Sequence, residues 1–338
     1  MKQVAVAAGV IKNTKGEVLI AKRADDQHQG GLWEFPGGKI EPNESAQQAL
    51  ARELNEELGI EVSASHPLIR IHHQYTDKSV LLDVWVVTQF TGEARGIEGQ
   101  PIQWVAPAKL TEFDFPAANA PIVAAAQLPD RIAILDDLDD TEALERAAQM
   151  ALEQGFPWII LRAPDNSEAQ LRRAISHVQP LADFAKAKLV LNCSIPLANK
   201  LKADALLLTA SHLVGMGSRA EFNGAWLGAA CHNAGELQLA QDKGLDFASL
   251  SPLVVNYETD SPFKEAATDT TDECQAVIGW TGFQSMVEPA RIPVYARGGL
   301  STLDIDQAQT LGAQGIMQSV SGSRVEENSS APLRGRRG

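Results

Sequence analysis

The stretch GKIEPNESAQQALARELNEELGI, residues 38–60, carries a helical pattern crowded with carboxylates. Apolar residues recur at steps of four along it, at Leu50, Leu54 and Leu58. This spacing predicts a helix over residues 44–58, with Asn43 as a candidate N-cap and Gly59 as the C-terminal stop. The helix has one apolar face, and its remaining surface is rich in glutamate.

Three of those glutamates, Glu53, Glu56 and Glu57, fall within one arc of about 100° at helical spacing. Carboxylates so close repel one another and cost helix stability unless a cation lies among them. Hard oxygen ligands suit Mg²⁺, with Mn²⁺ as a substitute, and such ions keep waters and bind substrate phosphates. The spacing therefore indicates a divalent metal site.

The competing interpretation is a solvated acidic helix face, which is the commoner meaning of an isolated E-x-x-E-E pattern. Two neighbouring features weaken it. Arg52 can orient a glutamate by bidentate hydrogen bonding, and Gly37-Gly38 lets the backbone approach a metal closely. The complete spacing resembles the Nudix box, whose defined places are filled by Gly38, Glu44, Arg52, Glu53, Leu54, Glu56, Glu57, Gly59 and Ile60.

The resemblance to MutT-type Nudix hydrolases extends over about residues 1–128, through EFPGGKIE (34–41), EGQPIQW (98–104) and FPAANAP (115–121). It implies an α/β/α sandwich with a mixed sheet. β-rich stretches at 2–12 and 17–22, joined by a hairpin turn at 13–16, fit this expectation, as do strands at 80–90 and 102–105. A second helix is expected over residues 117–128.

The same resemblance implies the roles of the site residues. Glu53, Glu56 and Glu57 carry the metal ions, Gly38 supplies a backbone carbonyl, and Glu98 is an additional metal-binding glutamate. Water then attacks the β-phosphorus of a nucleoside triphosphate and releases pyrophosphate, with metal ions lowering the pKa of that water. Glu53 is the first choice for the general base, and Glu44 and Glu98 stay open as alternatives.

Substrate contacts are expected from a second group of residues. Arg23 and Lys39 are candidate phosphate contacts. Asn119 matches the family's base-reading asparagine, which is expected near the residue matched by Phe35. An amide suits this role because it can donate to and accept from the edge of 8-oxoguanine. The alternative meaning of Asn119 is a helix cap.

From residue 131 the pattern changes to β-type runs alternating with helix-like segments. The runs lie at 131–136, 158–162, 188–192, 205–209, 226–230, 247–250, 293–296 and 315–319. Eight such runs predict a (β/α)8 TIM-type barrel over residues 131–320. A polar stretch begins directly afterwards, so the barrel lacks a clear last helix and residues 321–338 are expected to be a disordered tail.

The barrel resembles thiamine phosphate synthase and its noncatalytic or tautomerase relatives, through LGAACHNAGEL (227–237) and VYARGGL (294–300). The resemblance implies phosphate binding at Gly298, Gly299 and Ser319, and makes His232 a candidate acid or base. Thiazole or thiamine phosphate is the corresponding candidate ligand. The synthases' metal-binding carboxylates are replaced here by Cys193 and by the segment Ser211-His212, so no thiamine phosphate synthesis is expected.

Composition limits the class of protein. With 338 residues, 44% hydrophobic and 21% charged, the chain has room for about two soluble domains. A net charge of -14 argues against direct binding to duplex DNA, and no apolar run suggests a membrane span or a signal peptide. Three widely spaced cysteines, Cys193, Cys231 and Cys274, fit a reducing compartment, so a cytoplasmic location is expected.

These features together predict a Mg²⁺-dependent 8-oxo-dGTP diphosphatase that sanitises the nucleotide pool and so prevents mutation, joined to a degenerate phosphate-binding or tautomerase-like barrel. Two alternatives remain. One is a Nudix hydrolase of a thiamine-related or other pyrophosphate. The other is a regulator in which ligand binding to the barrel alters hydrolysis.

Overall fold

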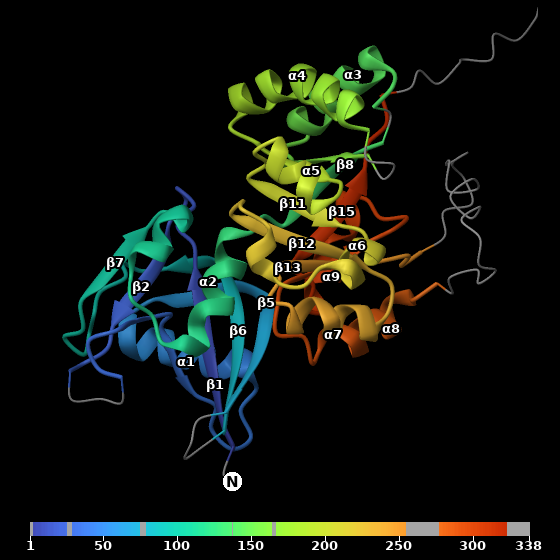
Figure 1. Ribbon diagram of the computed structural model, residues 1–338. Helices are drawn as coiled ribbons and strands as arrows, with labels where there is room; N and C mark the ends of the chain where they lie inside the picture. Colours follow the sequence, from blue (N-terminus) through green and yellow to red (C-terminus); the bar gives the residue numbers. More distant parts are fainter. Residues whose placement is uncertain are drawn as a thin grey trace, which may run out of the picture.

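The computed structural model describes residues 3–25, 29–74, 79–136, 138–163, 167–254 and 277–322. The elements up to α2 form one α/β body, and those from β8 onward form a second body beside it (Figure 1). Within the described ranges, every helix is too short or too polar to cross a membrane.

The N-terminal body contains two small sheets. Their elements are β1 (Gln3–Ile11), β2 (Val18–Lys22), β3 (Trp33–Glu34), β4 (Gly37–Lys39), β5 (Glu61–Gln74), β6 (Ser79–Thr91) and β7 (Ile102–Val105). One sheet has the order β4-β1-β6-β5 and the other the order β3-β2-β7. Strand β1 runs parallel to β6 and antiparallel to β4, so the predicted mixed sheet is confirmed.

Two helices, α1 (Ala46–Leu58) and α2 (Ala120–Gln127), cover opposite faces of these sheets. The alternation of β1 divides its side chains between them. Ala7 and Ile11 pack in the cluster that contains the α1 leucines, whereas Ala8 and Val10 pack with Ile122 of α2. The arrangement is the expected α/β/α sandwich, and its two apolar clusters hold α1 and its glutamates against the sheet edge.

Helix α1 begins two residues later than expected. Ser45, not Asn43, is its N-cap: the Ser45 side chain accepts from the Gln48 amide, and the Gln48 side chain accepts from the Ser45 amide. Asn43 has a left-handed φ of 70°, which an N-cap does not adopt. The correction moves Glu44 off the helix and onto the preceding loop.

Two other local predictions need correction. The turn at 13–16 exists, but only an isolated bridge between Lys12 and Val18 joins its arms, and β1 and β2 then enter different sheets. The helix expected over 117–128 is divided into a 3-10 turn at Ala117–Asn119 and α2.

The C-terminal body is a closed barrel of parallel strands in the order β10-β11-β12-β13-β14-β15-β8-β9, which confirms the predicted TIM-type fold. Its strands are β8 (Arg131–Leu135), β9 (Trp158–Arg162), β10 (Lys188–Asn192), β11 (Ala205–Leu208), β12 (Trp226–Cys231), β13 (Phe247–Leu250), β14 (Val294–Arg297) and β15 (Gly315–Ser319). Its helices are α3 (Thr141–Glu153), α4 (Glu168–Ala185), α5 (Ile195–Lys200), α6 (Ala210–Gly215), α7 (Ala234–Asp242), α8 (Gly279–Val287) and α9 (Ile305–Thr310). The sequence also predicts that the barrel lacks a clear last helix and that a disordered tail follows it. Both predictions concern residues from 323 onward, which lie outside the described ranges.

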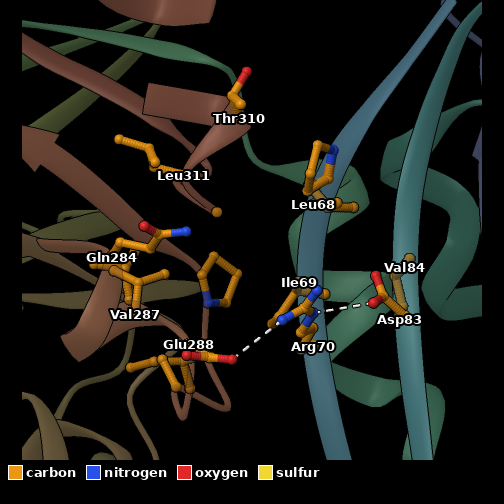
Figure 2. Close-up of a pocket in the computed structure, with 16 residues that line it drawn as sticks. Leu68, Ile69, Arg70, Asp83, Val84, Gln284, Val287, Glu288, Thr310 and Leu311 are labelled. Carbon is orange, nitrogen blue, oxygen red and sulfur yellow. Dashed lines mark hydrogen bonds and ion pairs between the residues drawn. The ribbon is translucent and has the colours of Figure 1, made fainter. Parts of the chain in front are cut away.

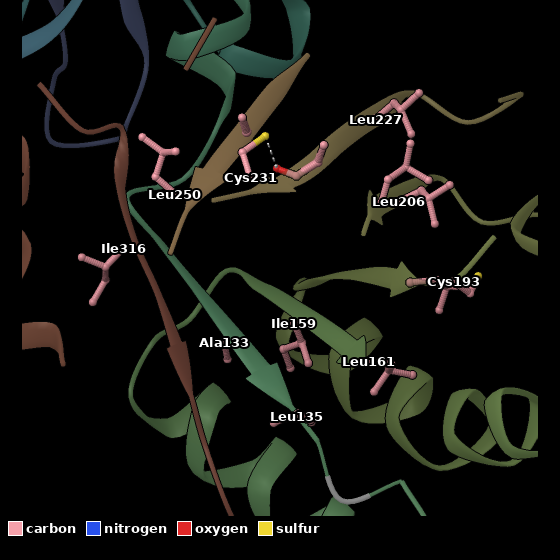
Figure 3. Close-up of a cluster of buried hydrophobic side chains, with 14 of the residues drawn as sticks. Ala133, Leu135, Ile159, Leu161, Cys193, Leu206, Leu227, Cys231, Leu250 and Ile316 are labelled. Carbon is pink, nitrogen blue, oxygen red and sulfur yellow. Dashed lines mark hydrogen bonds between the residues drawn. The ribbon is translucent and has the colours of Figure 1, made fainter. Parts of the chain in front are cut away.

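Side chains on the two faces of the barrel strands form separate cores. The inward face is closed by aromatic rings, in which Trp158 and Tyr295 each contact Phe247 edge-on. The outward face packs under the helices (Figure 3). Cys193 and Cys231 belong to this outer cluster, and burial raises the pKa of each thiol to about 12. Both behave as small buried hydrophobes; Cys274 lies outside the described ranges.

The segment that joins the two bodies is part of the barrel core. Leu128 packs against the inward aromatic cluster, and the Tyr295 hydroxyl donates to the Pro129 carbonyl at 2.7 Å. The buried side chain of Gln314 donates to the carbonyls of Ala125 and Leu128, at 3.0 and 3.2 Å. The segment that connects the two bodies therefore also holds them together, by hydrogen bonds and by the apolar contact of Leu128.

A second contact between the bodies encloses a pocket of about 110 Å³ between β5 and β6 on one side and α8, β14 and α9 on the other. Arg70 crosses it and pairs with Asp83 of its own domain and with Glu288 of the barrel (Figure 2). Leu68 and Ile69 of β5 line the wall of this pocket that belongs to the N-terminal domain (Figure 2).

Because Leu128 fills the barrel floor, Leu128→Ala should lower the free energy of unfolding by about 2–5 kcal/mol, as measured by denaturant titration. Leu303→Ala is the matched control, since Leu303 is 92% exposed and Leu128 only 3%. Equal stability of the two variants would show that the connection is a simple linker.

Candidate active site

Arg52 is the centre of the glutamate cluster. Its guanidinium makes a bidentate contact with Glu44, at 2.9 and 3.0 Å, and donates to Glu53 at 2.9 Å and to Glu56 at 3.2 Å. It also donates to the carbonyl of Lys39 at 3.0 Å. One cation therefore offsets the repulsion among three carboxylates and ties the helix to the preceding loop.

The contacts of Arg52 separate the candidate bases. Hydrogen bonds from Arg52 and from the Glu41 amide lower the pKa of Glu44, and both of its carboxyl oxygens are engaged. Glu53 shares only one oxygen with Arg52, and its side chain is 17% exposed, against 57% for Glu56. Glu53 thus combines a sheltered position with a second carboxyl oxygen that Arg52 does not bind.

Glycines 37 and 38 allow the sheet backbone to reach these carboxylates. A Cβ on Gly38 would lie 2.2 Å from the Glu53 carboxyl carbon, so no side chain fits between them. Gly37 has a φ of 146°, and its Cβ would meet the Ala7 carbonyl at 2.1 Å. Strand β4 therefore lies directly against α1, with Gly38 beside Glu53.

Glu57 lies deeper in the site. Burial, and then the charges of Glu34, Glu53 and Glu98, raise the pKa of Glu57 to about 8, although the Gly37 amide donates to its carboxylate at 3.2 Å. The Glu34 carboxyl is also in a buried position that raises its pKa, and it is paired with Arg23. Glu34 was missed as a site residue, although it is the first letter of the quoted EFPGGKIE segment.

Glu98 lies on an exposed loop that is fastened to the end of α1. The Ile97 amide and the Gln100 side chain both donate to the Glu57 carbonyl, at 2.9 and 3.0 Å. The loop therefore holds Glu98 on the same side as the helix carboxylates, close enough for its charge to raise the pKa of Glu57.

The candidate base-reading residues lie near α2. Phe35 is buried and stacks on Phe115, with ring centroids 5.3 Å apart. Asn119 occupies the N-cap position of α2, but its side chain makes no capping hydrogen bond. Its amide is therefore not consumed by the capping role that was the alternative interpretation. Lys39 is exposed beside the glutamates.

The donor chemistry of this site fits a hard divalent cation, since neighbouring carboxylates raise the pKa of Glu57 and the glycine at position 38 lets the Glu53 carboxylate reach the backbone. Among the described residues, however, no group of carboxylates, imidazoles and thiols has the convergent arrangement of a metal site. In this conformation Arg52 instead binds the oxygens of Glu53 and Glu56.

The barrel candidates lie at the carboxyl ends of its strands. His232 follows β12, and its Nδ1 lies 2.8 Å from the Ser251 carbonyl, so Nδ1 carries the proton and Nε2 is left as an acceptor in the neutral ring. Ser319 ends β15 and is exposed. A Cβ on Gly298 would lie 3.0 Å from Pro252, and one on Gly299 would lie 2.5 Å from the Val254 carbonyl, so close packing accounts for both glycines.

Comparison with known proteins matches the two bodies separately. A family model described as NUDIX domain covers residues 7–125, and one described as thiamine monophosphate synthase covers residues 132–320. An 8-oxo-dGTP diphosphatase of Escherichia coli (strain K12) is 40% identical over 124 residues, which are 37% of this chain and 96% of the relative. A CTP pyrophosphohydrolase of the same strain is 37% identical over 125 residues, 37% of this chain and 92% of the relative.

A solved MutT structure, from work on the proteins of Aliivibrio salmonicida and Vibrio cholerae, is 42% identical. The match covers 37% of this chain and 98% of that one, with a TM-score of 0.34.

The raised pKa of Glu57 predicts a pH-dependent stability in the presence of a chelator. In the unfolded chain Glu57 ionises near its ordinary pKa of 4.5, whereas in the folded chain it holds its proton until about pH 8. Wild-type stability is therefore lost progressively as the pH rises between these values. Glu57→Gln removes this loss, so its stability advantage over wild type, measured by urea unfolding, should grow from pH 5 to pH 8 and then level off.

The exposed Glu61→Gln is the control and should track wild type throughout. A difference between Glu57→Gln and wild type that stays constant from pH 5 to pH 9 would contradict the assignment.

Proposed function

Since the chain belongs to the NUDIX family through its N-terminal domain and to the thiamine monophosphate synthase family through its barrel, we propose that it hydrolyses 8-oxo-dGTP in a Mg²⁺-dependent reaction. The N-terminal domain is a Nudix hydrolase, and its relatives support nucleotide pyrophosphohydrolase activity. The observation that carries the proposal is the Arg52–glutamate cluster held against the Gly37-Gly38 backbone. The proposed domains are 1–128 and 131–320.

In the proposed reaction, water attacks the β-phosphorus and the bond from that phosphorus to the oxygen bridging it to the α-phosphorus breaks. The nucleoside monophosphate is the leaving group, and the β- and γ-phosphates, with the new oxygen, are released as pyrophosphate. Glu53, Glu56, Glu57 and Glu98, with the Gly38 carbonyl, would hold Mg²⁺. When bound, Mg²⁺ lowers the pKa of water and neutralises charge on the phosphate oxygens. Glu53 takes the proton from the attacking water, because it is sheltered and keeps one oxygen free of Arg52. Arg52 holds Glu53 in place through the hydrogen bond to one carboxyl oxygen.

Glu44 serves in this scheme as a positioning residue, not as the base, because Arg52 occupies both of its oxygens. Arg23, which follows β2, and Lys39, which ends β4, contact the phosphates. Arg23 pairs with Glu34, so a phosphate would compete with that carboxylate for the guanidinium.

Preference for the oxidised base is assigned to Asn119, whose side chain is spared from capping and lies at the start of α2. An amide reads the edge of 8-oxoguanine by donating and accepting together. The CTP pyrophosphohydrolase is nearly as similar to this chain as the 8-oxo-dGTP diphosphatase is. Overall sequence identity therefore does not distinguish the two bases, and the proposed preference rests on local contacts such as that of Asn119. The resulting activity would sanitise the nucleotide pool.

The barrel is proposed to bind a phosphate-bearing ligand without synthesising thiamine phosphate. Cys193, where the synthases carry a carboxylate, is buried in the outer cluster and its thiol pKa is raised to about 12, so it supplies no anionic ligand. Ser211 and His212, the other replacement, are both bonded to the Thr209 hydroxyl. His232, which is anchored through Nδ1 to the Ser251 carbonyl, keeps a tautomerase-like role open.

Glu53→Gln should lower kcat about 10²–10⁴-fold, the usual effect of removing a general base, while the unfolding midpoint stays the same or rises because repulsion is relieved. The assay is pyrophosphate release at saturating Mg²⁺, with Glu61→Gln as an isosteric control at an exposed position. Near-normal turnover of Glu53→Gln would remove Glu53 from the mechanism.

Asn119→Ala should reduce the preference for 8-oxo-dGTP over dGTP by on the order of 1–3 kcal/mol, the cost of a lost buried hydrogen bond. The ratio of the two kcat/KM values measures this preference. Asn55→Ala, on the exposed face of α1, should leave the ratio unchanged. Equal loss of both activities in Asn119→Ala would indicate a general structural role instead.

A further inference from the structure

The pocket between the two domains has apolar walls on both sides. Ile69 and Val84 line it from the N-terminal domain, and Val287 and Leu311 line it from the barrel (Figure 2). Its volume of about 110 Å³ is somewhat smaller than the roughly 150 Å³ of a cavity that binds benzene. The space therefore suits an alkyl group of about four or five carbon atoms. Small-molecule sites commonly form in this way, at the junction of two domains.

One end of the pocket is polar, and the charges there do not balance. Arg70 donates to Asp83 at 3.0 Å and to Glu288 at 3.3 Å, so one guanidinium meets two carboxylates. Within the described ranges, these three are the charged residues that line the pocket. The polar end therefore carries one negative charge in excess, on a chain whose net charge is -14.

The two carboxylates differ in how far protein donors already satisfy them. The Asp83 side chain is only 8% exposed, and its oxygens accept from Arg70 and from the Trp85 indole, at 3.0 and 2.8 Å. The Glu288 side chain is 64% exposed, and one of its oxygens contacts no donor of a described residue. Asp83 thus fixes Arg70 in place, whereas Glu288 keeps the capacity to bind a second cation.

An ammonium group fits this polar end better than a carboxylate does. It can donate to the remaining oxygen of Glu288 and neutralise the excess charge, while the ion pairs of Arg70 persist. A carboxylate would have to take Arg70 from Glu288, and it would add a third negative charge. The Gln284 side chain, which lines the pocket from α8, supplies an amide oxygen as a further acceptor. Because Glu288 is exposed, the charged head keeps part of its hydration, which limits the cost of burial.

We propose that the pocket between the domains binds a small organic ammonium ion, whose alkyl body lies among the apolar residues and whose charged head pairs with Glu288. Such a ligand contacts both domains, so it stabilises the arrangement in which they lie together. The described residues that line the pocket include neither the glutamates of the hydrolytic site nor the carboxyl ends of the barrel strands. Binding here is therefore independent of the proposed hydrolysis.

Two probes with the same branched five-carbon skeleton test the class of ligand. Isopentylammonium and isovalerate are titrated separately into the full chain at neutral pH and followed by isothermal calorimetry. The ammonium ion should bind about tenfold or more tightly than the carboxylate, because the excess charge attracts one head and repels the other. Absence of ammonium binding, or a carboxylate that binds at least as tightly, overturns the proposal.

Substitutions at exposed positions locate the binding. Glu288→Gln should weaken ammonium binding about threefold or more, since the head loses a charged partner. Glu142→Gln on α3, which removes another exposed glutamate paired with an arginine, should bind as wild type does. Gln284→Phe should abolish binding because its ring fills the pocket, whereas Ser285→Phe, at the next exposed position, should not.

A further pair of measurements separates loss of the site from loss of the fold. The thermal midpoints of Glu288→Gln and Gln284→Phe should stay close to that of wild type, because both side chains are exposed. The indole NH resonance of Trp85, assigned with Trp85→Phe, should shift when isopentylammonium binds, since this NH donates to Asp83. Ammonium binding that Glu288→Gln and Gln284→Phe leave unchanged, or that leaves the Trp85 resonance in place, would put the ligand elsewhere and contradict the proposal.

Discussion

The repulsion among glutamates on one face of α1, and its compensation by Arg52, is the interaction on which the N-terminal domain depends. Three acidic side chains at helical spacing would destabilise an isolated helix. Arg52 binds two of them, and it reaches across to Glu44 and to the Lys39 carbonyl, so the helix, the loop and β4 are joined at one point. The compensation is incomplete, because Glu57 lies deeper in the site. Its pKa is raised to about 8, so a proton neutralises this carboxylate where an arginine neutralises the others.

The barrel contains the corresponding problem with the opposite sign. Among the described residues, Arg162 and Arg297 have the single carboxylate of Asp136 near them. Within the described ranges the charge is thus unbalanced in both domains, negative at the Nudix glutamates and positive at the strand ends of the barrel. Such imbalance costs stability in the free protein, and a bound cation or anion would recover it.

The strand-helix alternation was sufficient to predict the barrel, because it depends on local periodicity, and the resemblance carried by the glutamate spacing implied the N-terminal sandwich. Strand β5 was missed because Pro67 interrupts the run and register shifts near Ala64 and Ile69 break the alternation. The cap was misplaced because Asn43 and Ser45 are both cap-forming residues, and only backbone conformation distinguishes them.

Other features depend on contacts between distant residues and could not be read from the pattern. Gln314 bonds to the Ala125 carbonyl, and Leu128 fills the barrel floor, although each pair of partners lies far apart in the sequence. Arg297 was quoted within VYARGGL without a role, because its inward position beside Arg162 follows only from the closed order of the strands.

The central claim is that Glu53 and its neighbours direct water to the β-phosphorus of an oxidised guanine nucleotide. The most direct measurement is hydrolysis in ¹⁸O-labelled water of an equal mixture of 8-oxo-dGTP, dGTP, CTP and thiamine diphosphate, with Mg²⁺ present and the products resolved by mass spectrometry. We expect 8-oxo-dGTP to be consumed first and the label to appear in pyrophosphate, with unlabelled 8-oxo-dGMP. Earlier consumption of another substrate, or label in the nucleoside monophosphate, would contradict it.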